Sequence, residues 1–189
     1  MELNRCWWSR GDDLYEAYHD HQWGVPVYSD ELLFEYLLLE TFQAGLSWIT
    51  ILRKRENFRK AFDDFNYQKI AAYTEEKQLK LQEEAGIIRN KLKIKAAISN
   101  AQAFMKIQKE FGSFSNYFWQ WTDGKPIVNH FKSKEEVPAT TELSDALSKD
   151  LKKRDFKFVG STIIYAHMQA TGMVNDHLTS CPCHPLNKD

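Results

Sequence analysis

Apolar side chains recur at intervals of three and four residues along most of this chain, which is the spacing of one face of an α-helix. Runs that alternate apolar and polar residues, as half-buried strands do, are nearly absent. Serine, threonine, asparagine and aspartate stand where helix N-caps are expected. We therefore predict an all-α fold. The predicted helices cover residues 32–39, a segment that starts at 48, short segments after 66 and 74, and residues 88–111, 113–121, 141–154 and 159–171.

The stretch between residues 123 and 138 is the least regular part of the chain. It opens with Asp123-Gly124-Lys125-Pro126, which is turn chemistry. No internal repeat and no low-complexity linker divides the chain, and 189 residues correspond to about one domain. We expect a single unit over residues 1–189, built of two helical lobes, with this stretch as the candidate boundary between them.

The composition excludes several classes of protein. Hydrophobic residues make up 43% of the chain and charged ones 27%, which excludes an extended disordered protein. No window holds the roughly 18 apolar residues of a membrane span, and no signal peptide opens the sequence, so we expect a cytoplasmic protein without a membrane partner. The net charge of −1 argues against binding nucleic acid through bulk charge. Basic clusters at 53–60, 89–95 and 152–157 still leave room for a local basic face.

Metal-ligating residues gather at the two ends of the chain. The odd number of cysteines, three, argues against a disulfide framework and favours a metal site. Two cysteines and two histidines form the tetrahedral site that zinc prefers, and a site with four protein ligands is structural because no position stays open for catalysis. The spacing leaves the choice of ligands open, since the C-terminal group can close a site by itself. The candidates are Cys6, His19 and His21 near the N-terminus and His177, Cys181, Cys183 and His184 near the C-terminus.

Residues 81–90 have the pattern of a helix, a glycine-containing turn and the start of a second helix. In such a hairpin the turn amides and the N-terminus of the second helix suit a DNA phosphate. Gly86 provides the turn, while Arg89, Lys91 and Lys93 add attraction to phosphates regardless of base sequence. Most glycine turns between helices bind nothing, so this pattern alone is a weak indication of DNA binding.

Aromatic residues and one carboxylate predict a pocket for a flat ring. Trp8, Tyr15 and Tyr18 lie close together in the sequence, and Trp48 follows Glu40, which ends a long apolar run. A carboxylate among aromatic side chains holds an electron-poor or cationic ring through stacking and charge. The alternative is an amphipathic helix with Glu40 on its exposed side.

Six motifs, together with Cys6 and Cys181, span nearly the whole chain. They are Tyr15-Glu16-Ala17-Tyr18-His19-Asp20, Trp23-Gly24-Val25-Pro26, Gln43-Ala44-Gly45-Leu46-Ser47-Trp48, Ile87-Ile88-Arg89-Asn90, Phe156-Lys157-Phe158-Val159-Gly160 and Val174-Asn175-Asp176-His177. In this order they closely resemble the motifs of the DNA-3-methyladenine glycosylase I family. That family belongs to the helix-hairpin-helix superfamily and acts in bacterial base-excision repair.

The resemblance implies a ligand set for the metal. It implies one structural zinc ion per chain, which ties the N- and C-terminal regions together through residues 6–19 and 177–181. Cys183 and His184 then lie outside the site. The implied ligands are Cys6, His19, His177 and Cys181.

The resemblance also implies the residues that bind the base and the DNA. Glu40 recognises the methylated adenine and is the expected catalytic residue, in a pocket lined by aromatic side chains. The DNA-binding hairpin covers residues 79–98, and Gly45 with Leu46 forms a wedge that enters the gap left by the extruded nucleotide. The implied pocket residues are Trp8, Tyr15, Tyr18 and Trp48, and the implied DNA contacts are Gly45, Leu46, Gly86, Arg89, Lys91 and Lys93.

The implied activity is hydrolysis of the N-glycosidic bond of 3-methyladenine in double-stranded DNA, which releases the base and leaves an abasic site. We expect a monofunctional, monomeric glycosylase without a nucleotide cofactor. Two other classes compete with it: a catalytically silent zinc-containing DNA-binding module, and a zinc-dependent hydrolase acting on a small substrate. Glu40 and the aromatic set argue against the silent module, and a zinc ion with four protein ligands would argue against the hydrolase.

The chain departs from the family pattern at two positions. Asp155 stands where family members often carry glycine, and Gln22 stands where some carry an acid. If residue 155 is a left-handed helix cap, aspartate is among the few residues that tolerate the position, so we expect only a small local cost.

Overall fold

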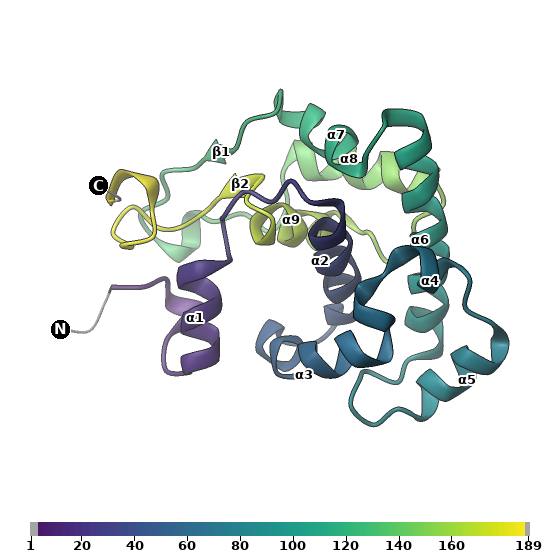
Figure 1. Cartoon of the computed structure of the whole chain (residues 1–189). Coiled ribbons are helices and arrows are strands. Elements are labelled where there is room, and N and C mark those ends of the chain that lie inside the picture. The colour runs from purple at the N-terminus through teal and green to yellow at the C-terminus, as the bar shows by residue number, and fades with distance from the viewer. Residues whose placement is uncertain (1–3, 188–189) are drawn as a thin grey trace.

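The computed structural model describes residues 4–187 and is mostly helical (Figure 1). The predicted helical fold is therefore confirmed. Short 3₁₀ turns at 7–9, 63–65, 120–122, 134–136 and 185–187 connect the longer elements. The elements are α1 (Asp13–His21), α2 (Asp30–Gln43), α3 (Trp48–Ala61), α4 (Tyr67–Ala71), α5 (Glu75–Glu83), α6 (Lys91–Phe111), α7 (Phe114–Trp119), β1 (Ile127–Val128), α8 (Glu142–Lys153), α9 (Ser161–Ala170) and β2 (Val174–Asn175).

Helix α2 is the central helix of the fold and is buried on nearly all sides. Its residues from Leu33 to Phe42 are all buried, because apolar side chains follow one another there instead of forming a single stripe. Helices α3, α6, α7 and α9 pack against it, and Phe34 and Phe42 lie in the main hydrophobic core. A polar residue near the end of this helix, such as Glu40, is consequently carried into the interior.

Several predicted caps are present. The Ser29 hydroxyl accepts a hydrogen bond from the amide of Leu32, and Thr141 forms a capping box with Ser144 at the start of α8. Asp155 follows α8 with a φ of +72°, so the position is left-handed, which is the condition under which we expect only a small local cost.

Two helices begin later than the sequence predicted. Helix α6 begins at Lys91 instead of residue 88, because the Asn90 side chain accepts hydrogen bonds from the first amides of the helix. Helix α9 begins at Ser161 instead of residue 159, since Phe158 has a φ of +55° and Gly160 is the N-cap. Helix α1 (Asp13–His21), capped by Asp12, was not among the predicted helices.

The irregular segment after residue 123 is held by a two-residue parallel ladder. Ile127 pairs with Val174 and Val128 with Asn175, so β1 joins this segment to the C-terminal region. A ladder this short leaves no alternating pattern in the sequence. Figure 1 shows the C-terminal segment lying beside the N-terminal one, next to α1.

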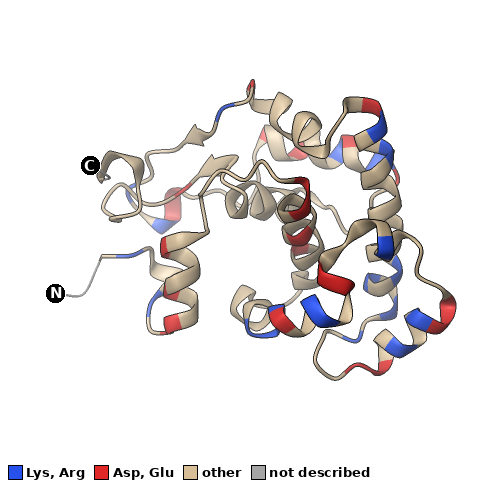
Figure 2. Cartoon of the chain, viewed as in Figure 1, with Lys and Arg blue, Asp and Glu red and all other residues tan. Residues whose placement is uncertain are grey.

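Charged side chains of both signs are interspersed along the outer helices (Figure 2). The C-terminal segment 177–187, which carries four of the metal-ligand candidates, contains neither acidic nor basic residues apart from its histidines. No helix within residues 4–187 is long and apolar enough to cross a membrane.

Candidate active site and metal centre

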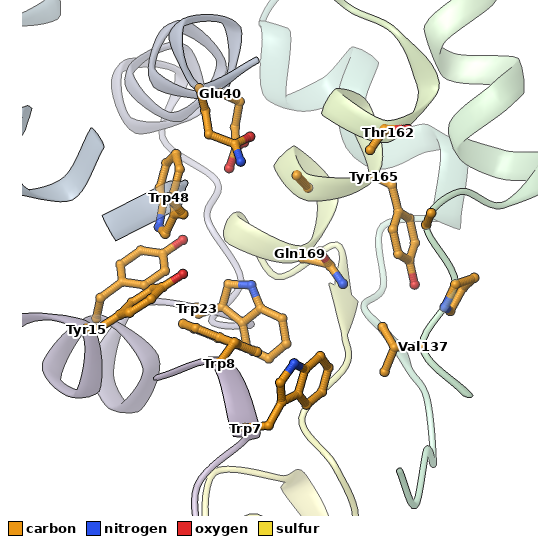
Figure 3. A pocket seen from close by; sticks show the side chains of 15 residues that line it. Trp7, Trp8, Tyr15, Trp23, Glu40, Trp48, Val137, Thr162, Tyr165 and Gln169 are labelled. Carbon is orange, nitrogen blue, oxygen red and sulfur yellow. The ribbon is translucent and has the colours of Figure 1, made fainter. Parts of the chain in front are cut away.

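A cavity of about 370 Å³ opens between α2 and α9 (Figure 3). Its walls come from segments far apart in the sequence: the N-terminal segment with α1, the end of α2, the start of α3, the loop before α8, and α9. Aromatic side chains dominate one side of it. The lining residues are Trp7, Trp8, Tyr15, Tyr18, Trp23, Glu40, Gln43, Trp48, Val137, Pro138, Ala139, Thr162, Tyr165, Ala166 and Gln169.

Glu40 is the acidic residue of this cavity. Its side chain is 3% exposed, and its Oε2 atom has no hydrogen-bond partner within residues 4–187. Burial raises the pKa of this carboxyl group to about 8, because the charged form loses its hydration. An unpaired buried carboxyl group is costly to folding, so its presence in a cavity points to a ligand that supplies the missing contacts.

A second buried acid on the same helix, Glu35, is paired with two arginine side chains, as a structural carboxylate normally is. Glu35 is also 3% exposed, but its Oε1 accepts from Arg55 at 2.7 Å and from Arg59 at 2.9 Å. Arg55 also donates to Gln22, at one of the two positions that depart from the family pattern. Two buried carboxyl groups five residues apart on one helix therefore have opposite environments, and only Glu40 faces the cavity.

The predicted aromatic residues surround the space next to Glu40. The ring centroids of Trp8 and Tyr15 lie 4.8 Å apart, and those of Tyr18 and Trp48 lie 5.6 Å apart. Among residues 4–187 the indole N–H of Trp48 is buried without an acceptor, so the residues that line the pocket include an unused hydrogen-bond donor as well as an unused carboxyl oxygen. These edges and faces suit a flat ring with polar atoms at its rim.

Sequence reasoning missed the opposite wall, which α9 supplies. Tyr165 and Gln169 both donate to the same carboxylate oxygen of Asp176, at 2.5 and 2.8 Å, and Asn129 donates to the other oxygen at 2.7 Å. Asp176 is fully buried and precedes His177. The motif Val174-Asn175-Asp176-His177 was the available signal, but it did not indicate which side chains the aspartate holds.

The candidate metal ligands come together in one cluster. Their ligand atoms all lie within 4.8 Å of one another, and all four side chains are buried. Cys181 Sγ lies 3.6 Å from His19 Nε2 and 3.6 Å from His177 Nδ1, and Cys6 Sγ lies 3.8 Å from His177 Nδ1. With metal–ligand bonds of zinc length, sulfur and nitrogen ligands of a tetrahedral site stand about 3.5 Å apart. The cluster therefore fits a metal ion and joins the two ends of the chain.

The outer hydrogen bonds of the two histidines support the same conclusion. His19 Nδ1 lies 2.8 Å from a carboxylate oxygen of Asp20, and His177 Nε2 lies 3.1 Å from the Trp23 carbonyl oxygen. Each ring therefore has an acceptor for one N–H and directs its other nitrogen at the cysteine sulfurs. This arrangement is typical of metal-bound histidine.

The two nearby C-terminal candidates lie outside the cluster. His184 Nε2 lies 3.0 Å from the Asn129 carbonyl oxygen, and its Nδ1 accepts from the Leu186 amide, so both ring nitrogens are engaged. The backbone amide of Cys183 lies 3.4 Å from the Cys181 sulfur, and its own sulfur lies 4.0 Å from His19 Nδ1 and 3.6 Å from an Asp20 carboxylate oxygen, on the outer side of the His19 ring. The geometry therefore favours the four-residue set over one that includes Cys183 or His184.

The predicted DNA-contacting residues lie in two places. Arg89 and Lys91 are exposed around the start of α6, and within residues 4–187 the amides of Ile88, Arg89 and Lys91 donate to no other group. The amide of Gly86 donates to the Glu84 side chain at 2.9 Å. A Cβ atom at this glycine would lie 3.0 Å from Asn57 of α3, so close packing also requires glycine here.

Gly45 and Leu46 form the turn between α2 and α3. Gly45 has a φ of +83°, and Leu46 is 39% exposed. Lys93 is placed differently from its neighbours, since it is 6% exposed and its ammonium group donates to the carbonyl groups of Phe42 and Ala44. Two of the three N–H donors of this ammonium group are therefore engaged inside the protein.

The fold is helical, its aromatic pocket around an unpaired carboxyl group suits a flat ring, and a four-residue cluster outside that pocket could hold a metal ion. Comparison with known proteins is specific. A profile of the methyladenine glycosylase family matches residues 7–184. The chain therefore belongs to the methyladenine glycosylase family.

Relatives match over nearly their full length. The DNA-3-methyladenine glycosylase 1 of Escherichia coli (strain K12) is 49% identical over 186 residues, which are 98% of this chain and 100% of that protein. The DNA-3-methyladenine glycosylase of Haemophilus influenzae is 45% identical over 95% of this chain and 97% of its own length. A crystal structure of a 3-methyladenine DNA glycosylase I superposes with a TM-score of 0.94 at 50% identity, covering 96% of this chain and 100% of that one. A structure of the 3-methyladenine DNA glycosylase I of Staphylococcus aureus, which describes how that enzyme recognises 3-methyladenine, superposes with a TM-score of 0.94. It is 37% identical, and the match covers 97% of each chain.

Proposed function

We propose that this chain hydrolyses the N-glycosidic bond between 3-methyladenine and deoxyribose in DNA, and that Glu40 recognises the base. As a member of its family, the protein removes 3-methyladenine from DNA. The observation that carries the assignment of Glu40 is its buried carboxyl group, which has an unpaired oxygen in a cavity with aromatic walls.

The charge of the substrate complements this site. Methylation at N3 makes the base cationic, so a carboxylate distinguishes it from unmodified adenine. In the empty pocket the raised pKa of about 8 keeps Glu40 protonated at neutral pH. A bound cation favours the ionised form, so entry of the methylated base releases the Glu40 proton to solvent and forms a charge pair in a poorly hydrated site.

The aromatic residues supply the binding energy that base extrusion requires. Taking a base out of the duplex costs a few kcal/mol, and stacking on aromatic side chains returns roughly 1–3 kcal/mol per base. Trp8, Tyr15, Tyr18 and Trp48 are the candidates for these contacts. We propose that the exposed amides and cations at the start of α6 hold the DNA backbone while Leu46 fills the gap in the duplex.

The reaction needs little acid catalysis. The bond between C1′ and the base nitrogen breaks with its electron pair moving to the cationic base, which leaves neutral. Water attacks C1′, loses its proton to solvent and completes the abasic sugar. Ionised Glu40 stabilises the positive charge that develops on the sugar, which is an electrostatic contribution.

We propose that the enzyme leaves the abasic strand intact. Strand cleavage by a glycosylase requires an amine nucleophile at the sugar, and the buried amine nearest to the hairpin, that of Lys93, donates to two carbonyl groups. The expected product is therefore an abasic site that breaks only under subsequent alkaline treatment.

We propose zinc as the metal of the four-donor cluster, held by Cys6, His19, His177 and Cys181. When bound there it would crosslink the N- and C-terminal segments and contribute to folding. No step of the base-release reaction uses it. Activity that persists after partial chelation, for as long as the protein remains folded, is the expected result.

Chromatography of the bases released from methylated duplex DNA tests the function. We expect free 3-methyladenine, with 7-methylguanine retained in the DNA. Glu40→Gln should reduce the release rate on the order of 10²-fold with little change in DNA affinity, because it removes one preorganised electrostatic contact. A folded wild-type protein that binds DNA and releases no base would favour the silent DNA-binding module instead, and equal activity of the variant would refute the role of Glu40.

A further inference from the structure

Lys93 is buried although it lies in the first turn of α6, within the proposed DNA-binding hairpin. Its side chain is 6% exposed. Its Nζ atom donates to the Phe42 carbonyl oxygen at 2.8 Å and to the Ala44 carbonyl oxygen at 2.7 Å. These contacts join residues about fifty positions apart in the sequence, and they do so at the end of α2 from which the Gly45 turn departs.

The position of this ammonium group has a clear local cause. The last carbonyl groups of a helix have no partner within the helix, and a cation near them also interacts favourably with the helix dipole. At the end of α2 the side chain of Lys93 satisfies two such groups. Lysine is therefore the C-terminal capping group of α2, supplied by another helix.

The turn that follows is tight. The amide of Leu46 donates to the Gln43 carbonyl oxygen at 2.6 Å, and the Gln43 side chain donates back to the Leu46 carbonyl oxygen at 3.1 Å. Gly45 has a positive φ, so the turn reverses the chain within two residues. Ala44, whose carbonyl group Lys93 binds, is the residue directly before this reversal.

We propose that Lys93 is a positioning residue that holds the Gly45–Leu46 turn in a fixed relation to the DNA-binding hairpin. This rests on the proposed function, in which the hairpin holds the DNA backbone and Leu46 enters the duplex. A side chain inserted into the duplex keeps a base pair open only if its own backbone does not shift. The two hydrogen bonds of the Lys93 ammonium group fix the turn to the start of α6. The distance between a phosphate bound by the hairpin and the gap filled by Leu46 therefore stays constant.

Lys93→Met tests the proposal, because methionine keeps most of the length and leaves both carbonyl groups without a donor. Lys109→Met is the matched control, since Lys109 is exposed at the far end of the same helix, outside the hairpin, and the variant has the same net charge. Three quantities are measured: the single-turnover rate of 3-methyladenine release from duplex DNA, the affinity for free 3-methyladenine followed by tryptophan fluorescence, and the affinity for a duplex with an abasic analogue. We expect Lys93→Met to lower the release rate about tenfold, with affinity for the free base within about twofold of wild type. The Lys109→Met control should match wild type in all three.

A double-mutant cycle with Leu46→Ala separates positioning from general stabilisation of the fold. If Lys93 acts through Leu46, the double variant releases base about as slowly as the slower single variant, whereas independent effects multiply. Multiplying effects, an unchanged release rate in Lys93→Met, or loss of free-base affinity in parallel with activity would each overturn the proposal. If Lys93→Met does not fold, Lys93→Gln, which keeps a shorter donor, enters the same cycle.

Failure of the proposed function is visible separately. In that case wild type itself releases no 3-methyladenine, whatever the variants do. A wild type that releases the base, combined with a cycle in which the two substitutions act independently, would refute only the positioning role.

Discussion

Replacing Glu40 with glutamine should make the folded protein more stable in alkaline solution, although it removes the residue proposed to recognise the base. Glutamine keeps the volume of the side chain and never ionises. The wild-type carboxyl group, in contrast, is buried without a counter-charge, and its pKa is raised from 4.5 to about 8 by burial. Ionising it in the folded state therefore costs free energy that the unfolded state does not spend.

The sign and size follow from proton linkage. Between pH 4.5 and about 8 the folded wild type binds more protons at this group than the unfolded chain does, so its free energy of unfolding falls as the pH rises. The contribution of the protonated Glu40 carboxyl group to the free energy of unfolding is fully present below the unfolded-state pKa of 4.5. It is lost progressively as the pH rises to the folded-state pKa of about 8. A tenfold change in proton affinity corresponds to about 1.4 kcal/mol, so wild type should lose roughly 2.5–3 kcal/mol relative to the variant between about pH 6 and pH 9.

Urea unfolding followed by circular dichroism at several pH values measures this difference. Other titrating groups act equally in both proteins, so the difference between the two curves isolates Glu40. Glu35→Gln is the informative comparison. Its free energy of unfolding should fall by about 3 kcal/mol even near neutral pH, because the substitution removes the buried counter-charge of Arg55 and Arg59. Parallel stability curves for wild type and Glu40→Gln across this range would refute the reasoning and would mean that Glu40 has an unrecognised partner.

Two further predictions concern the metal cluster and the end of α8. Cys181→Ser should lose bound metal and unfold several degrees lower, because a structural metal contributes its binding energy to folding. Cys183→Ser should keep both the metal content and the melting temperature of wild type. Elemental analysis and thermal unfolding measure the two quantities, and equal metal loss in both variants would contradict the proposed ligand set. Asp155→Gly should be about 1–2 kcal/mol more stable than Asp155→Ala, since the φ of +72° strains alanine and not glycine. Chemical denaturation of the two variants measures this difference. An alanine variant as stable as the glycine variant would show that the backbone at this position relaxes.

Local features of the sequence predicted most of the helices and several of their ends. Ser29 and Thr141 cap helices because a side-chain oxygen needs only the amides two or three residues away. The sequence raised a left-handed conformation at Asp155 only as a possibility, because aspartate is among the few residue types that tolerate it, and the structure shows that conformation. The cluster of Cys6, His19, His177 and Cys181 was reached through resemblance, since spacing alone left two C-terminal alternatives open.

Other features were decided only by packing between segments distant in the sequence. Whether Glu40 lies in the solvent or in a cavity depends on α9 and the loop before α8, which cover α2 from regions more than ninety residues away. Lys93 looked like a phosphate-binding cation beside Arg89 and Lys91, yet its side chain is drawn inward by the end of α2. Tyr165 and Gln169 are joined by Asp176 at the far wall of the pocket. A periodic pattern reports which face of a helix is apolar, but the partner that a polar group meets on burial is a property of the assembled fold, because unpaired donors and acceptors are satisfied across it.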